Sequence, residues 1–141
     1  MARVFWDTNL FIYLFENHPT LAERVEQVRF RMLDRSDQLF TSTLTVGEIL
    51  VQPVRAGRPD LEESYKRLFQ PPAVTVVPFD SLAAMQYARI RKDPTIKPPD
   101  AIQLACAAIA EADLFITNDE RLSRKLVAGI QFIVSLDKAP L

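Results

Sequence analysis

The segment Arg3-Val4-Phe5-Trp6-Asp7-Thr8-Asn9 decides the fold class, because an apolar run ends abruptly in an acid and two small polar residues. A short apolar run of this kind is typical of a strand that is buried on both faces, as strands of parallel sheets are. The next residues, 10–15, are apolar almost all round and predict a short buried helix. The segment therefore predicts the first strand–helix unit of a parallel α/β sheet, with Asp7 at the carboxyl end of the strand.

The same alternation of strand and helix patterns continues along the chain. Short apolar strands that alternate with helices predict a mostly parallel sheet of about four or five strands with helices on both faces. No repeat, low-complexity segment or linker interrupts the pattern, so we expect one domain over residues 1–141. Strands are expected at residues 3–6, 39–42, 74–77, 114–117 and 132–134, and helices at 10–15, 21–35, 45–53, 61–69, 101–111 and 119–126, with a further helix that carries Leu82, Met85 and Ile90.

Composition narrows the class of protein. The chain has 141 residues, of which 48% are hydrophobic and 25% charged, as in ordinary globular domains. Its net charge of −1 excludes nucleic-acid binding by bulk positive charge, so any such binding needs local basic groups or a metal. The single cysteine, Cys106, permits no intrachain disulfide. Because the N-terminus has no signal-peptide pattern and no stretch is long enough for a membrane span, we expect a cytoplasmic protein without a membrane partner.

Four acidic residues occupy similar positions in the expected strand–helix units, close to the end of a strand or the start of a helix. Asp7 and Asp119 follow strands, Glu48 lies in the first turn of the helix after the second strand, and Asp100 begins a helix behind Pro98 and Pro99. The carboxyl ends of parallel strands lie at one edge of the sheet, where ligands bind. The sequence therefore predicts that Asp7, Glu48, Asp100 and Asp119, the four acids below, meet at one rim.

Such a cluster needs a neutralising partner. Two bare carboxylates about 4 Å apart repel each other by roughly 4 kcal/mol at an effective dielectric constant near 20. Hard oxygen ligands favour Mg²⁺ or Mn²⁺, and with His18 as the single histidine no competing ligand set exists. A Mg²⁺ site of this kind keeps waters and accepts phosphate oxygens, which suits phosphodiester hydrolysis.

Each acid also has a purely structural interpretation. Asp7 could cap a helix, and Asp100 and Asp119 could lie at helix N-termini because the helix dipole favours negative charge there. Glu48 could complete a capping box with Thr45. Asp80 lies in a similar place between a strand and a helix, and we interpret it as a plain helix cap. The joint pattern favours the metal site.

The segments that carry this pattern resemble the PIN-domain family, and within it the stand-alone VapC-like toxins of toxin–antitoxin pairs. They are Phe5-Trp6-Asp7-Thr8-Asn9, Thr45-Val46-Gly47-Glu48-Ile49-Leu50, Pro99-Asp100-Ala101-Ile102-Gln103-Leu104-Ala105 and Phe115-Ile116-Thr117-Asn118-Asp119. The resemblance implies a PIN-like α/β/α fold and a Mg²⁺- or Mn²⁺-dependent endoribonuclease, with the four acids as catalytic residues and metal ligands.

The resemblance also implies roles for neighbouring polar residues and for partners. Thr8 and Asn9 match the polar pair after the first acid, and Thr117 and Asn118 match the residues before the last acid. Asn9 and Thr117 are expected to orient ligands or bound water. The implied partners are an RNA substrate, a second copy in a homodimer, and an antitoxin whose tail lies in the acidic groove and reaches the carboxylates with an arginine.

Basic residues form three groups near the expected rim, and we expect one group to hold RNA phosphates on either side of the scissile bond. The others would be solvated surface charges. The groups are Arg89, Arg91 and Lys92 with Lys97; Arg121, Arg124 and Lys125; and Arg55 with Arg58.

Two alternatives remain open. One is a Mg²⁺-dependent phosphohydrolase with Asp7 as nucleophile, although Asn9 stands where that chemistry usually has a second aspartate, and no well-placed lysine is found. The other is a non-catalytic PIN-like binding module with a vestigial site, against which the intact acids argue.

Overall fold

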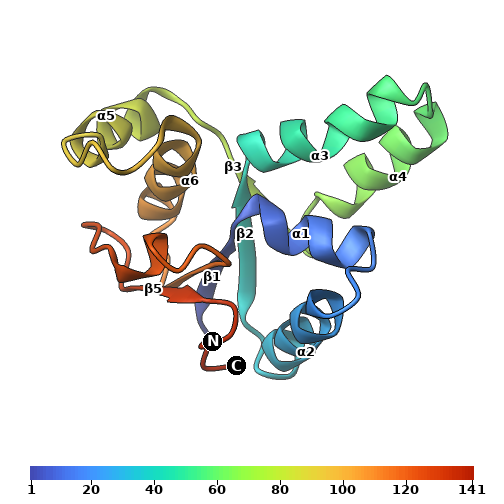
Figure 1. Cartoon of the computed structure of the whole chain (residues 1–141), viewed down its shortest axis with the longest axis horizontal. Helices are drawn as coiled ribbons and strands as arrows, with labels where there is room; N and C mark the ends of the chain where they lie inside the picture. Colours follow the sequence, from blue (N-terminus) through green and yellow to red (C-terminus); the bar gives the residue numbers. More distant parts are fainter.

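A computed structural model describes residues 1–141 and contains one five-stranded sheet in the order β3-β2-β1-β4-β5. All neighbouring strands are parallel, and Phe5 of β1 lies opposite Phe40 of β2 and Phe115 of β4. The predicted parallel α/β class and the number of strands are therefore confirmed (Figure 1). The strands are β1 (Arg3–Trp6), β2 (Gln38–Ser42), β3 (Thr75–Val77), β4 (Leu114–Thr117) and β5 (Phe132–Ser135).

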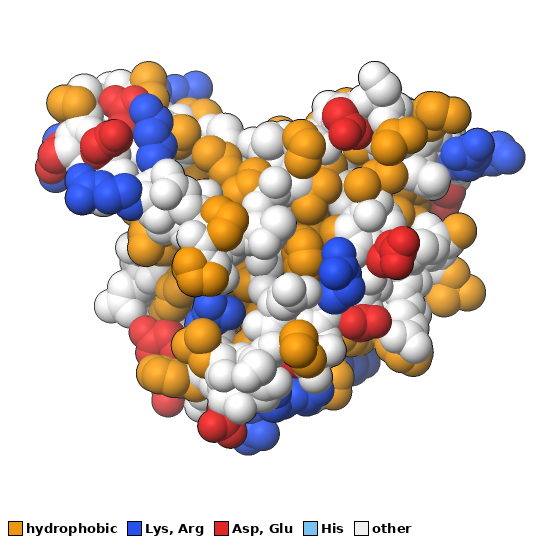
Figure 2. Space-filling model, turned by 180° about the vertical axis from the view of Figure 1, so that it is seen from behind, with side chains coloured by type: hydrophobic (Ala, Val, Ile, Leu, Met, Phe, Trp, Pro, Cys, Tyr) orange, Lys and Arg blue, Asp and Glu red, His pale blue; other side chains and the backbone are white.

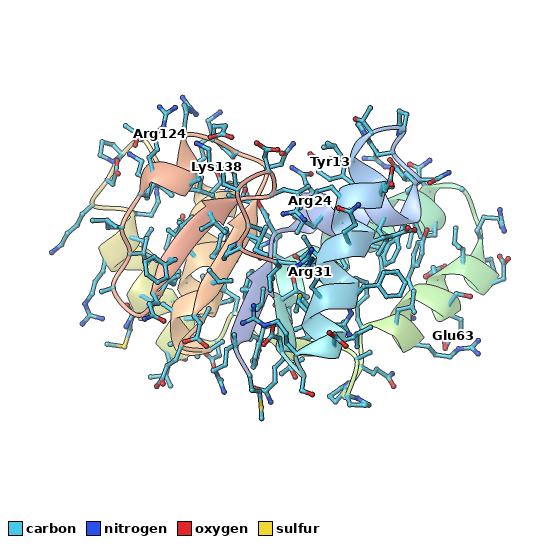
Figure 3. All side chains as sticks on the ribbon, turned by 90° about the horizontal axis from the view of Figure 1, so that it is seen from below. Tyr13, Arg24, Arg31, Glu63, Arg124 and Lys138 are labelled. Atoms are coloured by element: carbon cyan, nitrogen blue, oxygen red, sulfur yellow. The ribbon has the colours of Figure 1, made fainter.

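Helices cover both faces of the sheet, as predicted (Figures 1 and 3). Successive side chains of a strand point to opposite faces, so Phe5 joins the core under α5 and α6, whereas Val4 and Trp6 join the core under α1 and α2. The helices are α1 (Thr8–Phe15), α2 (Leu21–Asp34), α3 (Thr43–Arg55), α4 (Pro59–Leu68), α5 (Ser81–Ile90) and α6 (Pro98–Ile109), with one turn of 3₁₀ helix, η1 (Leu122–Arg124).

Helix α6 owes its buried position to small side chains. Ala101, Ala105 and Ala107 have no exposed surface, and their size lets α6 lie close to both α5 and the sheet. Proline occupies the first turn of α6, where a missing N–H costs no helical hydrogen bond. Asp100 is thereby brought to the carboxyl edge of the sheet on a rigid helix.

The two helical layers extend beyond the carboxyl ends of the strands as separate arms. Figure 2 shows the hollow between these arms, with hydrophobic side chains gathered in it. A recess of about 380 Å³ lies there between α3 and the α5–α6 layer. Its lining is Thr43, Leu44, Gly47, Glu48, Val51, Phe79 and Ile102. Both chain termini lie at the opposite end of the molecule (Figure 1).

The starts of α1, α3 and α4 were each predicted two residues too late, and the helix predicted from Asp119 is absent. Helix α3 begins at Thr43 rather than Thr45, and its N-cap is Ser42, whose Oγ accepts from the Thr45 N–H at 3.3 Å. Glu48 therefore lies in the second turn and completes no capping box with Thr45. Asp119 begins no helix to residue 126, because only the short turn η1 follows it.

Other local expectations agree with the structure. Asp80 is a plain cap, since its Oδ1 accepts from the Ala83 N–H at 3.0 Å. None of the helices combines the length and apolarity that a bilayer span requires.

Candidate functional site

Asp7 is the most enclosed of the four acids, with 9% of its surface exposed. It caps α1, and its Oδ1 accepts from the Thr8 N–H at 2.8 Å while its Oδ2 accepts from the Thr117 hydroxyl at 2.9 Å. Burial raises the pKa of Asp7 to about 6, against the lowering effect of these two hydrogen bonds, and the charges of Asp100 and Glu48 raise it further. Asp7 therefore lies within electrostatic reach of two other acids.

Asp100 lies in the first turn of α6 and is half-buried. Its pKa is raised by burial first and then by the charge of Asp119, with a further contribution from Glu48. Lys97 and Arg121 act in the opposite direction. Since Asp100 also acts on Asp7, this one carboxylate lies within electrostatic reach of all three other acids. These electrostatic couplings are what a rim of four acids would produce, but no three of the acids form a cluster that could hold a metal ion. Their joint role as ligands stays a prediction.

Asp119 is held by backbone groups at the end of β4. Its Oδ1 accepts from the N–H groups of Arg121 and Leu122 at 2.9 and 3.2 Å, and its own N–H donates to Thr117 Oγ1 at 3.1 Å. Thr117 therefore connects two of the acids, because the same hydroxyl donates to Asp7. Oδ2 of Asp119 has no protein donor and remains available to a ligand.

Glu48 differs from the other acids in being exposed on α3. Its Oε1 accepts a 2.7 Å hydrogen bond from the hydroxyl of Thr8, which is 6% exposed. The expected supporting residues thus divide into two pairs. Thr8 and Thr117 contact acids directly, whereas Asn118 donates to the Tyr13 hydroxyl at 3.0 Å and exposed Asn9 makes no side-chain hydrogen bond.

A buried polar network beneath the rim was missed by sequence reasoning. Gln103 of α6 donates from Nε2 to the hydroxyls of Thr8 and Thr45, each at 2.8 Å, and its Oε1 accepts from the Ser42 hydroxyl. Gln103 is 2% exposed, and Ser42 and Thr45 are fully buried. The available signal was Gln103 itself, a lone amide within the apolar stretch of α6, because a buried amide requires partners.

The donor set suits a divalent cation that retains water. The side chains present no preformed cage of three or more acidic, histidine or cysteine residues. Mg²⁺ needs no such cage, since it usually takes one or two protein carboxylates and keeps several waters. Burial is the largest cause of the raised pKa values of Asp7 and Asp100, and neighbouring carboxylates add to it; a bound cation would offset both effects by favouring the charged forms. The residues therefore fit Mg²⁺ or Mn²⁺ bound by one or two carboxylates.

One basic group lies beside these acids. Arg121, Arg124 and Lys125 line a cleft of about 330 Å³ together with Asp100 and Asp119. Arg124 points outward at the edge of the molecule that also carries Lys138 (Figure 3). The cleft thus joins two of the acids to a positively charged wall.

The other basic groups lie differently. Arg89 and Lys92 line a neighbouring cleft of about 250 Å³ that shares Ile96 with the first. The guanidinium group of Arg91 donates a hydrogen bond to the Ile96 carbonyl. Arg58 pairs with Asp60 at 2.9 Å, and neither it nor Arg55 lines either basic cleft.

Solved structures with this fold come from toxin–antitoxin complexes. A VapBC complex from Salmonella typhimurium bound to DNA is 22% identical, with a TM-score of 0.70 over 96% of this chain and 99% of that one. VapBC2 from Rickettsia felis, bound to a DNA fragment from its promoter, is 14% identical, with a TM-score of 0.71 over 94% and 97%. A toxin–antitoxin complex from Klebsiella pneumoniae is 20% identical, with a TM-score of 0.66 over 90% and 94%.

These likenesses establish a shared fold across almost the whole of each chain. No curated protein matches the sequence. The family comparison is more specific, because the PIN domain model matches residues 4–126 and so spans all four acids. The chain is a member of the PIN domain family.

Proposed function

We propose that this protein is a Mg²⁺- or Mn²⁺-dependent endoribonuclease that acts in the cytoplasm as the VapC-like toxin of a toxin–antitoxin pair. The observation that carries the proposal is the position of Asp100, whose pKa is raised by burial and by the charges of Asp119 and Glu48. Acids crowded in this way at the carboxyl edge of a parallel sheet are suited to a divalent cation and a phosphodiester.

Asp7 and Asp100 are the residues that would hold the ion, with Glu48 and Asp119 orienting its water or taking a further position. Both oxygens of Asp7 already accept hydrogen bonds. Oδ2 accepts only from Thr117 and retains a second lone pair for a ligand, whereas Oδ1 accepts from the Thr8 N–H and lies 3.5 Å from Gln103 Nε2. When bound, the ion supplies a more acidic water and polarises the phosphate. Thr117 keeps Asp7 in its ionised form by donating to Oδ2.

The RNA backbone is proposed to enter the cleft lined by Arg121 and Arg124. These guanidinium groups lie beside Asp100 and Asp119, so they could bind the phosphates that flank the scissile one. Arg89 and Lys92 would extend the path of the RNA through the adjoining cleft, whereas Arg91 already donates a hydrogen bond to the Ile96 carbonyl. The substrate is therefore expected to lie over η1 and the loop before α6.

An antitoxin and a second copy of this chain are the proposed protein partners. Support comes from the solved toxin–antitoxin complexes that share the fold. The recess between α3 and the α5–α6 layer offers apolar anchoring sites at Leu44, Val51 and Phe79, with the Glu48 carboxylate at its wall. An apolar segment carrying an arginine has the chemistry that such a groove accepts.

The test is cleavage of total RNA with Mg²⁺ or Mn²⁺, with EDTA, and with two matched variants. Asp100→Asn removes a carboxylate from the rim and is expected to abolish cleavage. Asp80→Asn keeps a helix cap of equal quality at the end of the neighbouring β3 loop and is expected to cleave like the wild type. Equal cleavage by Asp100→Asn and wild type would overturn the proposal.

The two alternatives have less support. An aspartyl nucleophile of this kind usually works with a second aspartate two positions on, where this chain has Asn9. A covalent phosphate trapped on Asp7 would revive that reading. The binding-module alternative gains support if the wild type neither cleaves RNA nor binds a divalent cation.

A further inference from the structure

The side-chain hydrogen bonds of the polar network beneath the rim all donate in one direction, from Ser42 through Gln103 toward Thr8. The Gln103 amide nitrogen carries two protons, one for the hydroxyl of Thr8 and one for that of Thr45. Ser42 donates its proton to Gln103 Oε1 and accepts from the Thr45 N–H, which orients the amide. An amide held in this way donates to the two threonines, and its nitrogen makes one further, long contact of 3.5 Å to Asp7 Oδ1.

The same order of donors continues from Gln103 through Thr8 to Glu48 at the surface. Thr8 Oγ1 lies 2.9 Å from Thr45 Oγ1 and 2.8 Å from Gln103 Nε2. Since Gln103 offers Thr45 no acceptor, the Thr45 proton goes to Thr8, and the two lone pairs of Thr8 Oγ1 are then filled. The remaining proton of Thr8 points to Glu48 Oε1 at 2.7 Å. The carboxylate oxygen of Glu48 is the acceptor that completes this chain of donors.

We infer that Gln103 is a positioning residue, which directs the Thr8 hydroxyl toward Glu48 and so fixes the orientation of that carboxylate for a divalent cation. This inference rests on the proposed function, because the orientation of Glu48 matters only if the rim binds a metal. Gln103 itself is buried and acts through Thr8.

Glu48 needs a neighbouring residue that fixes the orientation of its carboxylate, because the side chain of Glu48 is exposed. Its side chain stands in solvent on α3, where a flexible carboxylate would sample many rotamers. The buried donor holds Oε1 and leaves Oε2 for a ligand or its water. Residues that orient metal ligands in this way typically contribute about 10- to 100-fold to metal affinity.

The decisive variant is Gln103→Glu, which preserves shape but replaces the donor by an acceptor. The hydroxyls of Thr8 and Thr45 are then expected to turn toward residue 103, and Glu48 loses its donor. We expect the Mn²⁺ affinity measured by calorimetry to fall about 10-fold or more. Gln103 Nε2 also lies 3.5 Å from Asp7 Oδ1, so the added charge acts on Asp7 as well. Gln103→Met removes the donor without adding a charge, and a loss of about threefold or more in that variant assigns the effect to the hydroxyl.

Thr41→Val is the matched control. Thr41 is another fully buried residue of β2, and its hydroxyl donates to the Trp6 carbonyl at 3.0 Å, outside the network. This variant is expected to lower thermal stability while Mn²⁺ affinity stays within about twofold, so destabilisation alone is separated from positioning.

A double-mutant cycle tests whether Gln103 acts through Thr8. Thr8→Val removes the donor to Glu48 and is expected to lower Mn²⁺ affinity as Gln103→Glu does. In the Thr8→Val background, Gln103→Met, which adds no charge beside Asp7, should lower the affinity no further. A further loss there would overturn the inference.

The remaining outcomes are also decisive. Wild-type affinity in Gln103→Glu overturns the inference while leaving the proposed function intact. Absence of Mn²⁺ binding by the wild type overturns the proposed function and, with it, the inference. If Gln103→Glu does not fold, Gln103→Met takes its place, with a loss of about threefold or more supporting the inference and unchanged affinity overturning it.

Discussion

The hydroxyl of Thr117 donates a 2.9 Å hydrogen bond to Oδ2 of Asp7, across 110 residues of sequence. Burial raises the pKa of Asp7, and this bond is the largest influence in the opposite direction. Thr117, at the end of β4, therefore favours the charged form of Asp7, whereas burial of Asp7 at the end of β1 disfavours it.

Thr117→Val removes that donor with little change of shape, and it also removes the acceptor of the Asp119 N–H. We expect the metal-free protein at pH 8 to lose about 2 kcal/mol of unfolding free energy, the usual contribution of a hydrogen bond to a buried charge. Urea denaturation measures the loss, and Thr117→Ser, which keeps the hydroxyl, should recover most of it. Equal stability of wild type and Thr117→Val at pH 8 would contradict the role given to this bond.

Asp7→Asn is expected to stabilise the metal-free protein while weakening the proposed binding of a divalent cation. The pKa of Asp7 is raised from 3.8 to about 6, so its contribution to stability is full below pH 3.8 and disappears as the pH rises through 6. At 1.36 kcal/mol per unit, wild type should lose roughly 3 kcal/mol by pH 7 that the neutral Asn retains. Denaturation in EDTA at pH 4 and pH 8 tests this, and a variant-to-wild-type difference that did not grow with pH would count against it.

Arg121→Ala and Arg124→Ala are expected to weaken RNA binding through the loss of phosphate contacts. Each lost contact should reduce the slope of log affinity against log salt by about 0.7 for a single-stranded RNA. Fluorescence anisotropy in an Asp100→Asn background avoids cleavage during the titration. Arg58→Ala is the control, since Arg58 pairs with Asp60 at the start of α4, and an equal effect there would indicate non-specific charge attraction.

Cys106 is expected to resist alkylation in the native protein. The thiol is fully buried in α6, and burial, followed by the charge of Asp80, raises the pKa of Cys106 to about 12. At pH 8 this leaves about one folded molecule in 10,000 as thiolate. Mass spectrometry after iodoacetamide treatment should detect modification only as urea unfolds the chain, and rapid labelling without urea would mean that α6 opens readily.

The strands and most helices could be predicted because their signals are local. Each strand is an apolar run bounded by polar or proline signals, and the two ends of β1 and β4 were placed at the observed residues. The beginning of α3 was misplaced because Ser42 and Thr45 are both capable caps, and only the hydrogen bond from the Thr45 N–H to Ser42 distinguishes them. Helix ends depend on such three-dimensional choices.

The candidate site was predictable in its acids but not in its supports. The positions of Asp7 and Asp119 after strands are visible in the sequence, whereas the partners of Gln103 come from β2, α1 and α3 and meet only in the folded chain. Likewise, three basic groups looked equivalent until the packing of η1 placed Arg121 and Arg124 beside Asp100.

The sheet order has a consequence for biosynthesis. Strand β1 emerges first, yet its neighbour β4 is among the last segments made, and parallel pairings between such distant segments form slowly. Throughout most of translation Asp7 has neither Thr117 to hydrogen-bond nor Asp100 nearby. The four acids are therefore assembled only when nearly the whole chain is available, so a truncated or half-made copy carries the first acid without the others.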